Sequence, residues 1–108
     1  MPQANARTTN VNCNSKSLQV AVDRAHQGDT INVSGTCNER ITVQTDNITI
    51  DGGGSAVIDG TFDAGGDQSL VTIEGRRVTL RNITVQDSPR NGIAIRRGGW
   101  AIIEGATV

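Results

Sequence analysis

The feature of this chain that most limits its fold is a repeat of short apolar triplets. After residue 30, three-residue segments with apolar first and third members recur along the sequence. Ile93 follows Val71 by 22 residues, and Ala101 follows Val78 by 23 residues. Self-similarity at a fixed period of this size is typical of stacked repeat structures, in which each unit buries its apolar side against the next. The central residue of each triplet is expected to point outward, because side chains alternate along a strand.

The repeat predicts parallel strands stacked on three faces, with matching residues about 4.8 Å apart. The predicted fold class is all-β: a right-handed parallel β-helix (solenoid) of about three coils with an N-terminal capping α-helix. The strands expected on the three faces are 41–43, 71–73 and 93–95; 48–50, 78–80 and 101–103; and 31–33, 56–58, 83–85 and 106–108.

One helix is expected before the triplets, over residues 17–26. Apolar residues recur there at helical spacing, and Gly28 is available to end the helix. The chain therefore divides into a flexible N-terminus (1–10), a cap with the helix (11–29), and parallel coils (30–108) whose C-terminal end is open.

The composition agrees with narrow stacked strands. The charge of the chain produces no electrostatic field that would attract either of two classes of partner. Aromatic residues make up 2% of the chain and glycine contributes 13 of 108 residues, which suits slim strands with tight corners. The net charge is −1, with both signs interspersed. Neither nucleic acid nor an anionic membrane is therefore an expected partner.

Two cysteines, Cys13 and Cys37, are expected to form a disulfide. A metal site is not expected, because the cysteines are far apart in sequence and His26 is the single histidine. If paired, they contribute roughly 3.5 kcal/mol by restricting the unfolded chain. The alternative is two reduced, buried thiols. A disulfide implies an oxidising compartment, so we expect a secreted chain, although residues 1–10 contain no apolar segment typical of a signal peptide.

The run from Val11 to Gly60 resembles the opening of pectin-lyase-like right-handed β-helix proteins. The segments that carry the resemblance are SLQVAVDRAH, GDTINVSGT and NITIDGGGSAVIDG, followed later by LVTIEGRRVTLRNITVQDSPRNGIAIRRGG. The closest likeness is to the exported, largely uncharacterised members, which carry one cysteine before the helix and one after VSGT. The resemblance implies the β-helix fold. It implies little about function, because lyases, hydrolases and adhesins of this family begin alike.

Five residues are candidates for binding a polysaccharide. Four arginines fall in equivalent turns, where stacking would make a basic strip able to contact an acidic glycan, and one tryptophan next to them could stack on a sugar ring. The alternative is that these charges, which alternate with glutamates, only keep the turns soluble. The five candidates are Arg76, Arg77, Arg96, Arg97 and Trp100.

Catalytic residues are not expected. The outward residues of the first face, Thr42, Thr72 and Ala94, cannot act as acid, base or cation ligand. Acidic loops leave Ca²⁺ as the one cofactor to consider, if at least six oxygens converge, and solvated loop carboxylates are the alternative. The acidic loop residues are Asp59, Asp63, Asp67 and Asp87.

The sequence therefore predicts a non-catalytic structural β-solenoid module, a minimal or shortened N-terminal segment of an exported β-helix protein. Its open last coil is expected to pair with the same edge of a second chain and form a homo-oligomer. The residues expected at that edge are Ala101, Ile102, Ile103, Ala106 and Val108. The alternative function is a carbohydrate-binding or polysaccharide lyase or hydrolase fragment that acts on acidic glycans.

Overall fold

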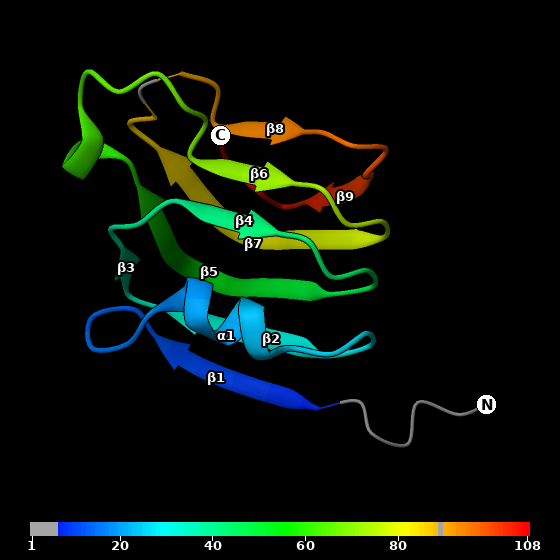
Figure 1. Cartoon of the computed structure of the whole chain (residues 1–108). Coiled ribbons are helices and arrows are strands. Elements are labelled where there is room, and N and C mark those ends of the chain that lie inside the picture. Colours follow the sequence, from blue (N-terminus) through cyan, green and yellow to red (C-terminus); the bar gives the residue numbers. More distant parts are fainter. Residues whose placement is uncertain (1–6, 89) are drawn as a thin grey trace.

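Short parallel strands joined by turns form the body of the protein, which is described by a computed structural model for residues 7–88 and 90–108. The strands form a six-stranded and a three-stranded parallel sheet. Figure 1 shows the smaller sheet lying in front of the larger one, with the helix at the end where the chain begins. The elements are β1 (Thr8–Asn12), α1 (Leu18–Arg24), β2 (Thr30–Ser34), β3 (Thr36–Cys37), β4 (Ile41–Val43), β5 (Thr49–Asp59), the 3-10 helix η1 (Thr61–Asp63), β6 (Val71–Ile73), β7 (Val78–Gln86), β8 (Ile93–Ile95) and β9 (Ala101–Glu104).

Strand pairing follows the spacing of the apolar triplets. The three-stranded sheet has the order β4-β6-β8, with Ile41 opposite Val71 and Val71 opposite Ile93. The six-stranded sheet has the order β1-β2-β5-β7-β9, with β3 also paired to β5. In it, Val78 lies opposite Ala101. These partners are those that the repeat distances predict. The expected place of 31–33 beside 56–58 is wrong, because β2 pairs with Thr49–Asp51 and β3 pairs with Val57 and Ile58.

The predicted fold class, a right-handed parallel β-helix of about three coils with three faces, is wrong. The structure is a small β-rich domain with two parallel sheets and one helix. The second and third expected faces belong to a single sheet, because β5 and β7 each run through both of them. One residue with positive φ, Asn82 at 53°, bends β7 without ending it. The matching bend in β5 lies at Gly53 and Gly54, whose φ angles are 61° and 87°. Gly52 lets β5 approach β7 at this bend, because a Cβ there would lie 2.5 Å from the carbonyl oxygen of Asn82.

The N-terminal region also differs from its prediction. Residues 1–6 of the expected flexible N-terminus (1–10) lie outside the described residues, but Thr8 to Asn10 belong to β1. This strand pairs in parallel with β2, with Val11 opposite Val33. Its sequence, TTNVN, has no alternating apolar pattern, and only one of its five side chains is buried. The sequence therefore did not predict this strand.

The core lies between the two sheets and is built from aliphatic side chains in register. Leu80 lies between Ile50 on β5 and Ile103 on β9. Ile50 and Leu80 are buried, whereas Ile103 is 44% exposed. Exposure rises in the same way in the three-stranded sheet, where Ile73 on β6 is buried and its partner Ile95 on β8 is 50% exposed. The core is therefore closed at the α1 end and uncovered at the β8–β9 end.

Helix α1 closes the core by attaching to two neighbouring segments. Its N-cap hydroxyl, on Ser17, accepts a hydrogen bond from the backbone N–H of Val20 and donates one of 2.7 Å to Glu39. The other carboxylate oxygen of Glu39 accepts the backbone N–H of Leu18, also at 2.7 Å. Because the first N–H groups of a helix have no partner within it, this carboxylate stabilises the helix start.

The side chain of Gln19 forms hydrogen bonds with the edge of β4 like those that a neighbouring strand would form. Its Oε1 accepts the backbone N–H of Thr42 at 2.6 Å, and its Nε2 donates to the carbonyl oxygen of Thr42 at 3.0 Å. One amide side chain thus satisfies both polar groups of an edge residue. Hydrogen bonds therefore join the helix to the sheet, as they join two neighbouring strands.

The disulfide predicted from the two cysteines is present. It joins Cys13, in the segment after β1, to Cys37 on β3, with the two Cα atoms 4.9 Å apart. The alternative of two reduced thiols is therefore wrong. The cross-link holds the N-terminal strand against the body of the domain near the start of α1.

Replacing Gln19 tests the attachment of the helix to the sheet edge. We expect Gln19→Ala to lower the free energy of unfolding by about 2 kcal/mol, because two hydrogen bonds are lost and the polar groups of Thr42 lose their partner. Chemical denaturation followed by circular dichroism measures the change. Gln27→Ala, at an exposed position just beyond the helix, is the matched control. Equal stability of the two variants would contradict this role for Gln19.

Candidate functional site

The four arginines of the predicted strip lie in two turns. Arg76 and Arg77 connect β6 to β7, and Arg96 and Arg97 connect β8 to β9. Arg77, directly before β7, has a φ angle of 57°, and Asn47 has the same φ in the turn before β5. The turn before β9 contains two left-handed residues, Arg97 at 55° and Gly98 at 76°. Left-handed residues therefore turn the chain at each of these corners.

The structure brings only three of the five predicted residues into one groove. Arg76, Arg77 and Trp100 line a hollow of about 430 Å³ together with Gln27, Asp46 and Asn47. Arg97 instead forms an ion pair with Glu74, with 3.3 Å between Nε and Oε2. The predicted continuous strip is thus divided, because one of its cations is already neutralised by a neighbouring carboxylate.

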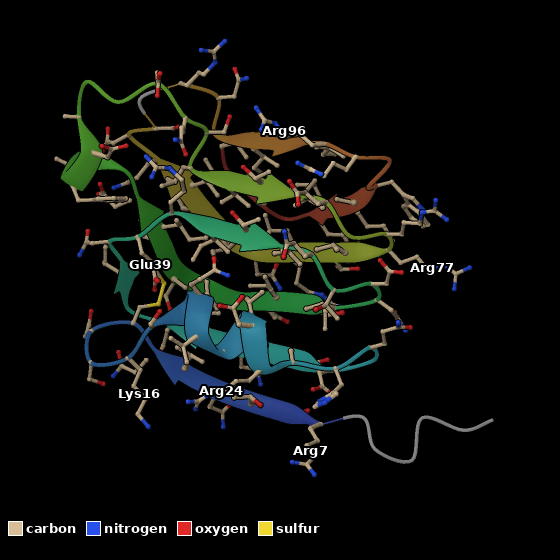
Figure 2. All side chains as sticks on the ribbon, viewed as in Figure 1. Arg7, Lys16, Arg24, Glu39, Arg77 and Arg96 are labelled. Atoms are coloured by element: carbon tan, nitrogen blue, oxygen red, sulfur yellow. A yellow bond between two sulfur atoms is a disulfide. The ribbon has the colours of Figure 1, made fainter. Side chains whose placement is uncertain are left out.

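Arg96 lies at a different groove, over the outer side of β6 and β8. This hollow has a volume of about 390 Å³ and is lined by Thr72, Ala94 and Arg90 among others. Figure 2 shows Arg96 beside β8 and Arg77 at the far tip of the turns, pointing away from the body of the domain. The two arginines do not share a site.

The groove beside Trp100 is suited to binding, not to acid–base chemistry. Asp46 is the one carboxylate among its lining residues, and it accepts the backbone N–H of Arg76 at 2.9 Å. General acid–base catalysis needs a positioned proton donor and acceptor near the same ligand atom. This groove offers two guanidinium groups and the side chain of Trp100, so it can hold an anionic or stacked ligand.

The acidic loop residues have polar partners of their own, and two of them, Asp59 and Asp87, share Thr61 as a hydrogen-bond partner. Asp63 pairs with Arg40. Asp59 accepts hydrogen bonds from the backbone N–H of Thr61 at 2.7 Å and from the amide of Gln86 at 2.9 Å. Hydrogen bonds from these same two residues lower the pKa of Asp59. Within residues 7–88 and 90–108, no cluster of three or more His, Cys, Asp or Glu side chains is placed to hold a metal ion.

A larger groove, which the sequence analysis missed, lies at the helix end of the domain between α1 and β1. Its volume is about 490 Å³, and it is lined by Arg24 of α1, by Arg7 just before β1 and by Lys16 before the helix. One sequence signal could have found it. Val20 lies off the buried face formed by Leu18 and Val22, and it stays 45% exposed.

Asp29 is the buried carboxylate beside this groove, and it fixes the two elements that form it. One oxygen accepts the backbone N–H of Arg7 at 2.9 Å, and the other accepts that of His26 at 3.0 Å. Chiefly through the hydrogen bond from His26, and also that from Arg7, the pKa of Asp29 is lowered from its ordinary value, against an opposing effect of burial. The carboxylate thus ties the start of β1 and the end of the helix region to β2.

No family model matches the sequence, and no curated protein is similar to it. The resemblance to pectin-lyase-like proteins therefore stays a prediction from sequence. Among the helices of the described residues, none is long and apolar enough to cross a membrane.

The lowered pKa of Asp29 predicts a loss of stability in acid. Because its pKa is lower in the folded state, its stabilising effect is complete above the ordinary value of 3.8 and is lost as the pH falls through the folded value. We expect Asp29→Asn to be less stable than the native protein at about pH 7 and to lose less stability on acidification.

Urea unfolding at a series of pH values measures both effects. Asp67→Asn, which changes an exposed carboxylate in a loop, is the control and should keep the native pH profile. A constant stability difference between Asp29→Asn and the native protein down to about pH 2 would contradict the assignment.

Proposed function

We propose that this protein is a non-catalytic structural module that forms homodimers through the edge made by β8 and β9. The observation that carries the proposal is the exposure of large apolar side chains at that edge. They are Ile95 at 50%, Trp100 at 44%, Ile102 at 43%, Ile103 at 44% and Val108 at 66%. Ile103 lies opposite the buried Leu80, whereas Ile102 lies opposite Thr79 on the outer face, so apolar side chains are exposed on both faces of the edge. Apolar exposure of this kind on a small domain marks a contact surface.

Position in the fold explains why these side chains are uncovered. Ile103 continues the column of Ile50 and Leu80, which are buried because each has a neighbour on both sides. The interior surface of β9 has such a neighbour on one side only. Covering it with another apolar surface would stabilise the contact by about 25 cal/mol for each Å² removed from water.

The backbone of the same edge is open to pairing with another strand, because β8 and β9 are each the last strand of their sheet. Among the described strands, β8 pairs only with β6 and β9 pairs only with β7. Their sequences, IAI and AIIE, contain no proline or lysine of the kind that protects an edge strand. One acidic residue, Glu104, is the single charge in them, and it lies 3.7 Å from Nε of Arg81.

A second copy of this chain is the partner that the geometry favours. Head-to-tail stacking would need the opposite end of another copy, but there Gln19 already occupies the edge of β4 and α1 covers the core. The β8–β9 edge is therefore better matched to itself. A two-fold axis through it gives a closed dimer with antiparallel pairing.

Two further observations support an extracellular, non-catalytic role. The disulfide between Cys13 and Cys37 favours an oxidising compartment. The groove beside Trp100 carries binding groups without an acid–base pair. Binding of an acidic glycan there is the weaker alternative, because Arg97 is paired with Glu74 and Arg96 lies at another groove.

A charge placed in the edge tests the dimer. We expect Ile103→Lys to remain folded, since the position is 44% exposed, and to weaken dimerisation at least about tenfold by burying an ammonium group at the contact. Sedimentation equilibrium over a range of protein concentrations measures the dissociation constant.

Phe62→Lys is the matched control, because Phe62 is 49% exposed on η1, away from the edge, and its replacement should leave dimerisation unchanged. A native protein that stays monomeric at millimolar concentration would contradict the proposal. So would an Ile103→Lys variant that dimerises as the native protein does.

A further inference from the structure

We propose that the groove between α1 and β1, called here the helix groove, binds a small organic anion with an apolar body, such as a fatty carboxylate. The groove lies at the opposite end of the domain from the β8–β9 edge, so this inference does not depend on dimerisation (Figure 1). Its volume of about 490 Å³ lies within the range of small-molecule sites, roughly 300 to 1,000 Å³.

The floor of the helix groove is apolar. Val11 of β1 is buried, and Ala21 and Ala25 are half-buried beside it. Val20 adds an exposed side chain, although α1 already buries Leu18 and Val22 on its inner face. An apolar residue on the outer side of a short helix has no role in the core. It does supply a surface for the hydrocarbon part of a ligand.

Three cations surround this floor. Arg24 is one turn beyond Val20 on the helix, Lys16 precedes the N-cap Ser17, and Arg7 lies at the start of β1. Figure 2 shows Lys16, Arg24 and Arg7 along the same side of the domain, next to α1 and β1. In the part of the chain that the structure describes, these three side chains form no ion pair.

The one carboxylate in the helix groove, that of Asp29, offsets only one of these three positive charges. Both oxygens of Asp29 are used by the backbone N–H groups of Arg7 and His26, and the residue is 5% exposed. The side chains of Lys16, Arg24 and Arg7 therefore leave a net positive charge around an apolar floor. A ligand with an anionic head and a hydrocarbon body matches both parts, since charge-assisted hydrogen bonds hold the head and the floor covers the body.

Titration of the isotopically labelled chain with octanoate, followed by backbone amide NMR shifts, tests the proposal. We expect saturable shifts confined to β1 and α1. The affinity should exceed that for 1-octanol, which lacks the charge, and that for acetate, which lacks the hydrocarbon chain, by about tenfold each. Equal binding of octanol or acetate would overturn the proposal, as would shifts centred on Trp100 or an absence of binding at about 10 mM.

Two variants identify the parts of the site. Arg24→Gln removes one charge and should weaken octanoate binding by about threefold to tenfold. Val20→Asp places a carboxylate on the floor at a position 45% exposed, so the fold is kept and binding should fall more than about tenfold.

Arg77→Gln and Phe62→Asp make the same changes elsewhere on the surface and should leave binding unchanged. Unchanged affinity in Arg24→Gln and Val20→Asp would contradict the assignment. Tighter binding of an oligoglutamate peptide than of octanoate would show instead that the groove takes an acidic peptide, and would equally overturn the proposal.

Discussion

The structure depends on aliphatic side chains held in register by parallel strand pairing. Each interior residue is covered by the residue opposite it on the strand before and on the strand after, as Leu80 is by Ile50 and Ile103. The core needs no large side chain, and the only Phe and the only Trp of the chain are both exposed. Such a core is a row of similar layers and has no central cluster of large side chains. Every strand layer needs a covered neighbour on each side, so the two ends decide how the domain is completed.

The two ends of the domain differ in how the interior is covered. At the β1 end, α1 covers the interior, Gln19 pairs with the backbone of Thr42, and Glu39 satisfies the start of the helix. The β8–β9 end has no such cover, and its aliphatic side chains are half-exposed. Both proposals follow from this difference. The uncovered edge supplies the dimer contact, and the cover at the other end creates the helix groove.

The sequence predicted the pairing of β4, β6 and β8 and of β5, β7 and β9, because register depends on spacing, and the distance from Val71 to Ile93 shows in the residue pattern. It placed 31–33 wrongly, because β2 pairs with Thr49–Asp51, and it missed the strand β1. The fold class could not be predicted in the same way. Whether two faces merge depends on the positive φ angles at Asn82, Gly53 and Gly54 and on the close approach at Gly52, and neither is visible in periodicity.

The candidate site was predicted only in part, because two turns that correspond in the repeat can differ in conformation and in the partners of their side chains. Arg97 pairs with Glu74, whereas Arg77 lines the groove beside Trp100. The helix groove was missed because it is formed by β1, whose exposed side chains carry no apolar alternation.

Native-state hydrogen exchange of backbone amides tests the central claim most directly, since it measures the stability of each layer separately. If the core is a stack covered at one end only, protection should be highest in β5 and β6 and should fall through β8 to β9 in the monomeric Ile103→Lys variant. Equal protection of β5 and β9 in that variant would contradict the account, because the last layer would then not depend on a neighbour.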